Sequence, residues 1–394
     1  MSAILKKPSA RKKIIFTYLI FSINGMTALS VGLILPFVRD AHNFSYSFAG
    51  MLISVHAVGY LTASFTAGLL PKYIGFKQSC LIFSSTLFFS FALLSASNNQ
   101  LIIILAFILT GLARGSTSNF CNIIINNLAP GVVWLISGMH SMFAIGALLL
   151  PLFLTFLTSI NSDHWIYIVY FMMVMGLLSF SLYSVLPLQN EKKQASKQDN
   201  SFGFLKNPTF YLVTGTLFFY LCAEQGVIGW LVTYFRNTGL LTGNIAQIMS
   251  SVLWIAILIG RLLTTYLSTL VAKGKLLLTM GFGLVIFFTI LMFSSSTLWI
   301  IIGILGFGLS MSGIYATTVS YAGKLIRDYS MTWSVILTFA SLGNILMPSI
   351  IGAVADFAGI VAGISSIIFA LVLALVFIIA LIIYTKKQIK SEHI

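Results

Sequence analysis

Long apolar runs separated by short polar segments make up most of this chain. Twelve such runs can be marked, each close to the ~20 residues that a helix needs to cross the hydrocarbon core of a membrane. Because lipid offers no partner to backbone N–H and C=O groups, each run is predicted to be helical. The runs lie near residues 14–38, 47–70, 79–97, 101–127, 132–158, 165–187, 208–234, 244–267, 276–293, 298–322, 329–353 and 360–384.

The amino-acid composition agrees with this pattern. Of the 394 residues, 58% are hydrophobic and only 8% are charged, whereas a soluble domain carries about 25% charged residues. Such a composition excludes a soluble enzyme, a disordered chain and a disulfide scaffold. It predicts an all-α polytopic membrane protein.

The positively charged residues predict the orientation of these helices. With the N-terminus in the cytoplasm, the inner segments hold eighteen Lys and Arg residues, and Arg39 and Arg236 fall outside. Because basic residues concentrate in cytoplasmic loops, both termini are predicted to be cytoplasmic in a multi-pass protein of the cell membrane. The inner residues are Lys6, Lys7, Arg11, Lys12, Lys13, Lys72, Lys77, Lys192, Lys193, Lys197, Lys206, Lys273, Lys275, Lys324, Arg327, Lys386, Lys387 and Lys390.

The chain also divides into two similar halves. The longest polar stretch, 189–207, is predicted to be a cytoplasmic linker between a six-helix bundle at 1–188 and another at 208–394. Several residues of the first half recur 197 positions later, which indicates a parallel repeat and two pseudo-symmetric bundles. The repeated pairs are Gly32 with Gly229, Gly111 with Gly308, Gly146 with Gly343, and Pro151 with Pro348.

Other classes of function find little support. A net charge of +14 would suggest nucleic acid in a soluble protein, but here the basic residues form short clusters between apolar runs, as topology signals do. Cys80, Cys121 and Cys222 fall within or at the ends of apolar runs and are predicted to be small buried hydrophobes. No His/Cys spacing typical of a metal site is present. We therefore expect no nucleic-acid partner, no metal and no cofactor.

Three motifs carry a family resemblance. Residues 68–77, GLLPKYIGFK, resemble the G-x-x-x-D-R-x-G-R-K loop of the major facilitator superfamily, although Lys72 and Tyr73 replace its acidic residue and arginine. Residues 220–234, YLCAEQGVIGWLVTY, are similar to the Y-x-G-x-E…G-W…T-Y pattern of fucose-permease-like sugar:proton symporters. Residues 139–151, MHSMFAIGALLLP, resemble the L-H-x-x-F-G-x-G-A…P pattern of the same branch.

This resemblance extends over essentially the whole chain and implies a fold of twelve transmembrane helices in two six-helix bundles. One departure concerns the fourth run, where that branch can place a carboxylate and this chain has none. The drug-antiporter signature of the fifth run, ending in G-P-x-x-G-G, is absent from this sequence.

One acidic side chain lies deep within a predicted span. Glu224 is ~22 Å from the cytoplasmic end of its helix by helical rise, and a charge at such a depth costs from about 3 to over 10 kcal/mol in lipid. Glu224 is therefore expected to face the protein interior. It is expected to act there either as a proton-coupling carboxylate or sugar-hydroxyl acceptor, or as a fixed ion-pair partner that holds two helices together. Of these roles, we predict proton coupling.

Arg114 is the basic residue nearest the predicted midplane, in the fourth run. An opposite charge within ~4–6 Å would stabilise the ionised forms of both Arg114 and Glu224. We predict conditional coupling, in which protonation of Glu224 frees Arg114 to engage a substrate oxygen. Arg261 is the alternative partner of Glu224.

Amide, guanidinium and aromatic side chains supply further candidates for binding a polar solute. Planar donors and amides suit sugar hydroxyls, while amides also join membrane helices and aromatic rings also pack. Arg261 and Lys77 are predicted to act in gating. The predicted substrate-binding residues are Asn24, Arg114, Asn119, Asn122, His140, Gln225, Trp254, Tyr315 and Asn344.

Together these features predict a secondary active transporter that is not an enzyme. It is expected to import a small polar solute, a sugar or sugar-like compound, with H⁺ by alternating access around a midplane site. Its partners are then a small-molecule substrate, the proton and the lipid bilayer, and the protein is expected to be a monomer. A drug or lipid exporter of the same superfamily, working as a proton antiporter, is the first alternative, although the buried polar residues argue against it. A non-transporting membrane sensor is a remote one.

The orientation can be tested by labelling single cysteines from each side of the membrane. In a cysteine-free background, cysteines placed at Ser196 and Asn98 should react with an impermeant maleimide from opposite sides, because the lysine distribution places residue 196 inside and residue 98 outside. Labelling of both positions from the outside would contradict the predicted orientation.

Overall fold

The computed structural model describes residues 8–128, 133–188, 203–329 and 331–392. Within these residues, twelve helices are long and apolar enough to cross a membrane. This confirms the predicted all-α fold and makes the chain an integral multi-pass membrane protein. The predicted linker, 189–207, lies mostly outside the described residues, and its last part forms a short 3-10 helix, η2 (Gly203–Lys206).

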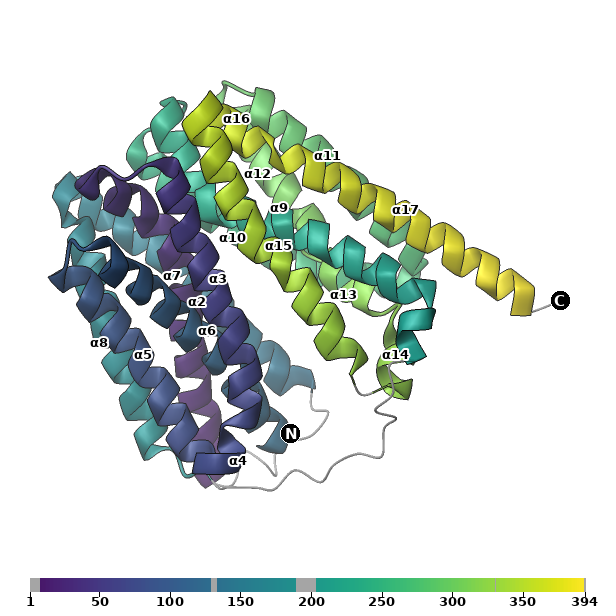
Figure 1. The fold of residues 1–394 in the computed structure, drawn as a ribbon, viewed down its shortest axis with the longest axis horizontal. Helices are drawn as coiled ribbons and strands as arrows, with labels where there is room; N and C mark the ends of the chain where they lie inside the picture. Colours follow the sequence, from purple (N-terminus) through teal and green to yellow (C-terminus); the bar gives the residue numbers. More distant parts are fainter. Residues whose placement is uncertain (1–7, 129–132, 189–202, 330, 393–394) are drawn as a thin grey trace. The chain divides into compact units, whose positions relative to one another are not determined.

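The helices group into two compact units, of which the first comprises Met1–Phe44 and Met51–Gln194. In this unit the first long helix packs against α6 and α7, and α5 packs against both α6 and α8 (Figure 1). Its elements are α2 (Pro8–His42), α3 (Tyr46–Leu69), α4 (Pro71–Ile74), α5 (Phe76–Ala96), α6 (Gln100–Leu128), α7 (Val133–Ile160), the 3-10 helix η1 (Ser162–Trp165) and α8 (Ile166–Val185).

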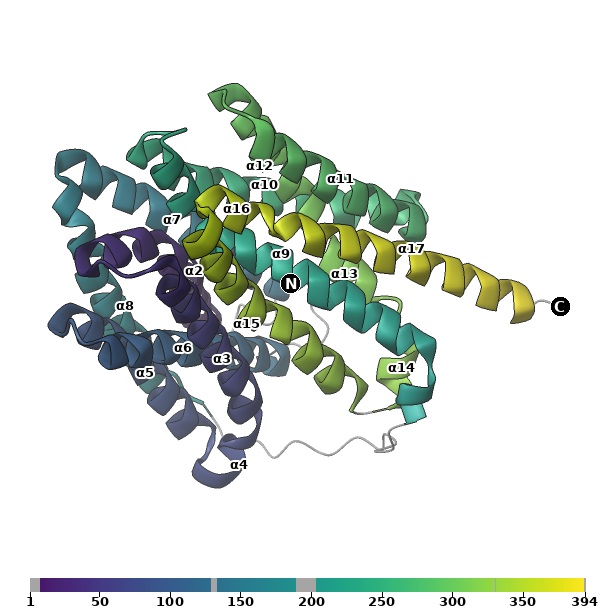
Figure 2. The ribbon, with the colours of Figure 1, turned by 45° about the horizontal axis from the view of Figure 1, so that its top comes forward.

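The second unit comprises Ser45–Gly50 and Ala195–Ile394, so the first residues of α3 are grouped with it. Its first long helix, α9, packs against α15, α17 and α10 (Figure 2). The elements after η2 are α9 (Pro208–Thr238), α10 (Gly243–Leu270), α11 (Lys273–Phe293), α12 (Thr297–Met311), α13 (Ile314–Val319), α14 (Gly323–Asp328), α15 (Thr332–Ala358), α16 (Ile360–Ser365) and α17 (Ile367–Glu392).

Two predicted spans are interrupted in the structure. The run at 360–384 is divided between α16, which ends at Ser365, and α17, which begins at Ile367. The run at 298–322 was expected to be a single helix, but α12 ends at Met311 and α13 begins at Ile314, with Gly313 as the N-cap between them. The apolar run gave no sign of this break, because hydropathy reports burial in lipid and not the path of the backbone. Backbone carbonyls released by such a break require a partner within the protein.

The core of the first unit is a buried cluster to which α2, α3, α5, α6, α7 and α8 all contribute side chains. Phe21 of α2, Phe83 of α5, Phe120 of α6 and Tyr183 of α8 belong to one buried cluster. Two of the predicted buried cysteines also belong to it, and all three cysteines of the chain are buried and free.

Glycines that recur at the 197-residue offset have the same packing role in both units. A Cβ on Gly146 of α7 would collide with the backbone carbonyl of Ser22 on α2. A Cβ on Gly343 of α15 would collide with the backbone carbonyl of Phe218 on α9. Since helices approach this closely only where a residue has no side chain, each glycine fixes the contact between the first and fifth long helices of its unit.

A second repeated pair makes an equivalent contact. Gly111 of α6 lies against the backbone carbonyl of His56 on α3, and Gly308 of α12 lies against the backbone carbonyl of Leu253 on α10. The contacted residues, His56 and Leu253, are themselves 197 positions apart. The repeat is therefore present in the packing of the helices as well as in the sequence.

These glycine contacts predict the effect of adding one methyl group. Gly146→Ala and Gly343→Ala should each lower the free energy of unfolding by about 1–3 kcal/mol, because the new Cβ must push a helix backbone aside. Thermal unfolding of the purified protein in detergent measures this. The matched control is Gly243→Ala, where a Cβ meets nothing within 4 Å, and it should change stability by less than about 0.5 kcal/mol. Equal melting of all three variants would contradict this account of the packing.

Candidate functional site

Two helices of the first unit present polar side chains at helical spacing. His56, Tyr60 and Ser64 follow one another at four-residue intervals along α3 and so share a face of that helix. Arg114 and Ser118 have the same spacing on α6. A contact between Arg114 and Tyr60 and a hydrogen bond from Asn119 to Ser64 join α6 to α3.

The predicted residue Arg114 lies against an aromatic ring. Its guanidinium carbon is 5.0 Å from the centroid of the Tyr60 ring, within range of a cation–π interaction. The charge of Arg114 also acts on His56, which is 1% exposed and has no hydrogen-bond partner for either ring nitrogen among the described residues. The half-buried Arg114 thus lies beside an aromatic ring and a buried imidazole.

Three predicted asparagines make hydrogen bonds within the same unit. Asn24 of α2 donates from Nδ2 to Ser118 Oγ at 2.9 Å, and Asn119 donates from Nδ2 to the Ser64 carbonyl at 2.7 Å. Asn122 donates from Nδ2 to the carbonyl of Ser118 at 2.7 Å, within its own helix. Asn24 and Asn119 therefore join α6 to α2 and to α3, so part of their role is structural.

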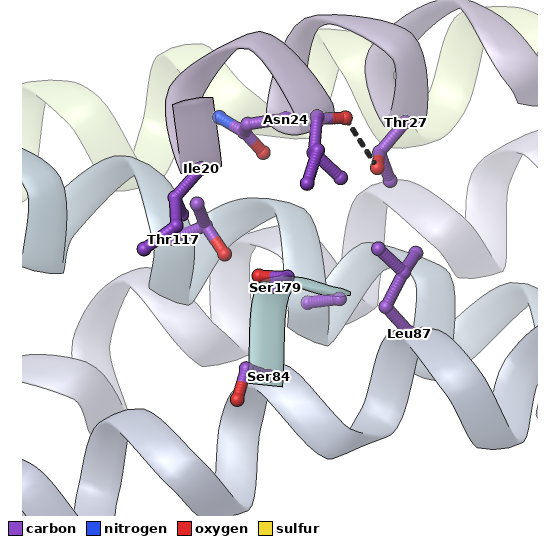
Figure 3. A pocket seen from close by; sticks show the side chains of 9 residues that line it. Ile20, Asn24, Thr27, Ser84, Leu87, Thr117 and Ser179 are labelled. Carbon is purple, nitrogen blue, oxygen red and sulfur yellow. Dashed lines mark hydrogen bonds between the residues drawn. The ribbon is translucent and has the colours of Figure 1, made fainter. Parts of the chain in front are cut away.

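A small polar cavity lies beside Asn24 (Figure 3). Asn24 and Thr27 line it from α2, Thr117 from α6, and Ser84 and Ser179 from α5 and α8. Its volume of about 10 Å³ is close to the space that one water needs. Asn24 is 2% exposed, and its Oδ1 has no hydrogen-bond partner within the described residues. A water in this cavity would give that oxygen a donor.

In the second unit the predicted residue Glu224 is paired with a tyrosine. The Tyr220 hydroxyl lies 3.1 Å from Glu224 Oε1 and belongs to the same helix, one turn earlier. The same hydroxyl lies 3.2 Å from the carbonyl oxygen of Met311, the last residue of α12. Tyr220 is buried and Glu224 is half-buried.

The break between α12 and α13 brings further predicted residues to this pair. The charge of Arg261, on α10, and the Tyr315 hydroxyl group, on α13, both act electrostatically on Tyr220. The Tyr315 ring in turn meets the ring of Trp333 edge-on, with the centroids 6.2 Å apart. A carboxylate, a cation and a phenol thus lie near one helix end, an arrangement that can bind and release a proton.

Five other predicted residues lie on α7, α10, α9, α15 and α5. The His140 ring meets Phe21 edge-on at 5.3 Å between centroids, and Trp254 is a buried side chain of α10. Gln225 and Asn344 are half-buried on α9 and α15. Lys77, in the first turn of α5, is half-buried as well.

Sequence reasoning missed several residues of both clusters. His56, Tyr60 and Ser64 were detectable as a polar stripe at four-residue spacing in an otherwise apolar run. Tyr220 was quoted as part of a motif, but its spacing of four from Glu224 also predicts that the two side chains meet. No pattern in the sequence predicts the contact between the Tyr220 hydroxyl and the Met311 carbonyl, because this contact depends on the helix break.

The geometry defines a polytopic membrane protein with polar clusters buried among apolar helices. The family model described as Major Facilitator Superfamily matches residues 15–333. The chain belongs to this superfamily, and it is a transporter rather than an enzyme.

Two curated relatives are similar over most of the chain. The glucose/mannose transporter GlcP of Bacillus subtilis (strain 168) is 23% identical over 350 residues, which is 86% of this chain and 86% of the relative. Bypass of stop codon protein 6 of Saccharomyces cerevisiae (strain ATCC 204508 / S288c) is 21% identical over 326 residues, or 76% of this chain and 64% of the relative.

Solved structures share the fold. The crystal structure of the nucleoside transporter NupG superposes with a TM-score of 0.77 at 13% identity, covering 96% of this chain and 100% of that one. The crystal structure of a D-xylose-proton symporter gives a TM-score of 0.73 at 14% identity, with 94% and 97% covered. At these identities the likeness concerns the fold alone.

The contact between Arg114 and Tyr60 can be measured by substitution. Tyr60→Phe keeps the ring face and should leave the free energy of unfolding nearly unchanged, whereas Tyr60→Leu should lower it by about 0.5–2 kcal/mol. The measurement is thermal unfolding in the wild-type and Arg114→Gln backgrounds. Tyr73→Leu is the control, since Tyr73 is 83% exposed. An equal loss from Tyr60→Leu in both backgrounds would show that the ring does not contribute through Arg114.

Proposed function

We propose that this transporter imports a small polar solute, a sugar or sugar-like compound, together with H⁺ by alternating access. The observation that carries this proposal is the pairing of Glu224 with Tyr220 at the α12–α13 break, with Arg261 nearby. A carboxylate in a membrane-spanning helix is costly unless it has a function or a partner. A carboxylate that binds and loses a proton can couple substrate movement to a proton gradient.

The first unit supports a polar substrate. Its amides and Arg114 offer planar donors on helices that are otherwise apolar, a combination suited to hydroxyl-rich solutes. The names of the relatives agree, since one transports glucose and mannose and one solved structure is a D-xylose-proton symporter. We assign substrate contact to Arg114, Asn119 and Asn122, and proton binding to Glu224.

The remaining assignments complete the proposal. Arg261, whose charge acts on Tyr220, the partner of Glu224, serves as the charge that holds the carboxylate ionised when no proton is bound, and Lys77 serves in gating. The protein works as a monomer in the cell membrane with both termini in the cytoplasm. The bundles 1–188 and 208–394 are the two domains, joined by the linker 189–207.

Replacement of the carboxylate by an amide tests proton coupling. Because Glu224→Gln mimics the protonated form, exchange of preloaded D-[¹⁴C]glucose or D-[¹⁴C]mannose should continue at a rate within about threefold of wild type. Uptake against a concentration gradient, driven by an inward pH gradient in proteoliposomes, should be lost. Asp163→Asn, the same chemical change in the exposed turn η1, should preserve both activities. Concentrative uptake at the wild-type level in Glu224→Gln would refute the proton role.

A further inference from the structure

One hydroxyl group in the second unit faces two acceptors. The Tyr220 Oη atom is 3.1 Å from Glu224 Oε1 and 3.2 Å from the Met311 carbonyl oxygen. A tyrosine hydroxyl carries a single proton, so at any moment it donates to one of these oxygens and not to the other. The two hydrogen bonds are therefore alternatives.

The second acceptor is available because a helix ends there. Met311 is the last residue of α12, and the last carbonyls of a helix have no intrahelical donor. Gly260 of α10 lies directly beneath this end, since a Cβ on it would collide with the Ser312 side chain. Gly313 lies equally close to the Thr264 side chain. The end of α12 is thus held between the Tyr220 hydroxyl and the backbone of α10.

The charge around Tyr220 comes from few groups. Glu224 acts from its own helix, Arg261 from α10 and Tyr315 from α13. In the described residues, η2, α15, α16 and α17, which also pack on α9, add no charged group to this set. A change in the charge of Glu224 is therefore the main event that can alter the direction in which Tyr220 donates.

We propose that Tyr220 is a positioning residue that links the protonation of Glu224 to the break between α12 and α13. When Glu224 is ionised, the Tyr220 hydroxyl donates to the carboxylate in a charge-assisted hydrogen bond. When Glu224 takes up one proton from solvent, its new O–H donates to Tyr220 Oη, and the tyrosine proton rotates to the Met311 carbonyl. Tyr220 neither gains nor loses a proton in this exchange.

Protonation of Glu224 would in this way change how the end of α12 is held. The end of α12 is anchored to α9 in the proton-loaded state and is released from it when the proton leaves. This inference rests on the proposed role of Glu224 as the proton site, and it adds a route by which that proton reaches the backbone of a neighbouring helix.

A fluorophore on α13 tests the link without any substrate. Ala316 is exposed, so Ala316→Cys can carry bimane in a background in which Cys80, Cys121 and Cys222 are replaced by alanine. The full-length protein in lipid nanodiscs is titrated from about pH 5 to 9, a range that spans typical shifts of buried carboxyls. Wild type should show a pH-dependent emission change. Glu224→Gln should give a flat profile at the low-pH value.

The decisive variant is Tyr220→Phe, which removes the hydroxyl and keeps the ring. Its pH-dependent emission change should fall about tenfold. Glu224 can still bind a proton in this variant, but no hydroxyl group is left to donate to the Met311 carbonyl when it does. Tyr220→Gln restores a donor and an acceptor and should recover part of the response. Tyr234→Phe removes the same group from the same helix about 21 Å away and should retain the wild-type profile.

The outcomes separate this inference from the proposed function. If Tyr220→Phe responds to pH as strongly as the wild type does, the role of Tyr220 is overturned and proton coupling by Glu224 still stands. The same conclusion follows if the emission of the wild-type protein does not change with pH although the protein still shows proton-driven uptake. A pH response that persists in Glu224→Gln overturns both. Loss of the response in Tyr220→Phe and Glu224→Gln, with retention in Tyr234→Phe, supports the link.

Discussion

The absence of hydrogen-bonding partners in lipid is the constraint on which the rest of this structure depends. It forces the apolar runs into helices, because backbone polar groups must be satisfied within the segment. It also makes a polar side chain within a span costly when it has no partner inside the protein. Polar clusters are therefore expensive, and a charged residue buried in a span is a candidate functional position.

The two units meet this constraint in different ways. In the first unit, amides connect α6 to α2 and α3, and a guanidinium group lies over the ring of Tyr60. In the second unit, a tyrosine, a glutamate and a backbone carbonyl gather at an interrupted helix. The repeat places these clusters on corresponding segments, since Arg114 and Met311, like Ser118 and Tyr315, are separated by 197 residues. The same scaffold thus carries amides and a guanidinium group in one unit and a carboxylate paired with a tyrosine in the other.

The helices could be predicted from the sequence because hydropathy alone decides which segments enter the membrane. The repeat could be recognised because Gly146 and Gly343 occupy equivalent positions at which two helix backbones touch and only glycine fits.

The site was only partly predictable. Glu224 and Arg114 stand out as charges in apolar runs, but His56 looks like an ordinary packing residue until its two ring nitrogens are seen to be buried without partners in the described chain. The break after Met311 escaped prediction because it changes the backbone path without changing the hydropathy.

We propose above all that a proton travels with the solute by way of Glu224. The most direct measurement is the pH of a weakly buffered medium around proteoliposomes when D-glucose, D-mannose or another sugar from a panel is added. We expect the sugar that is taken up to make the medium more alkaline as protons enter the vesicles, and we expect Glu224→Gln to abolish this change. Sugar entry into wild-type vesicles with no movement of protons would contradict it.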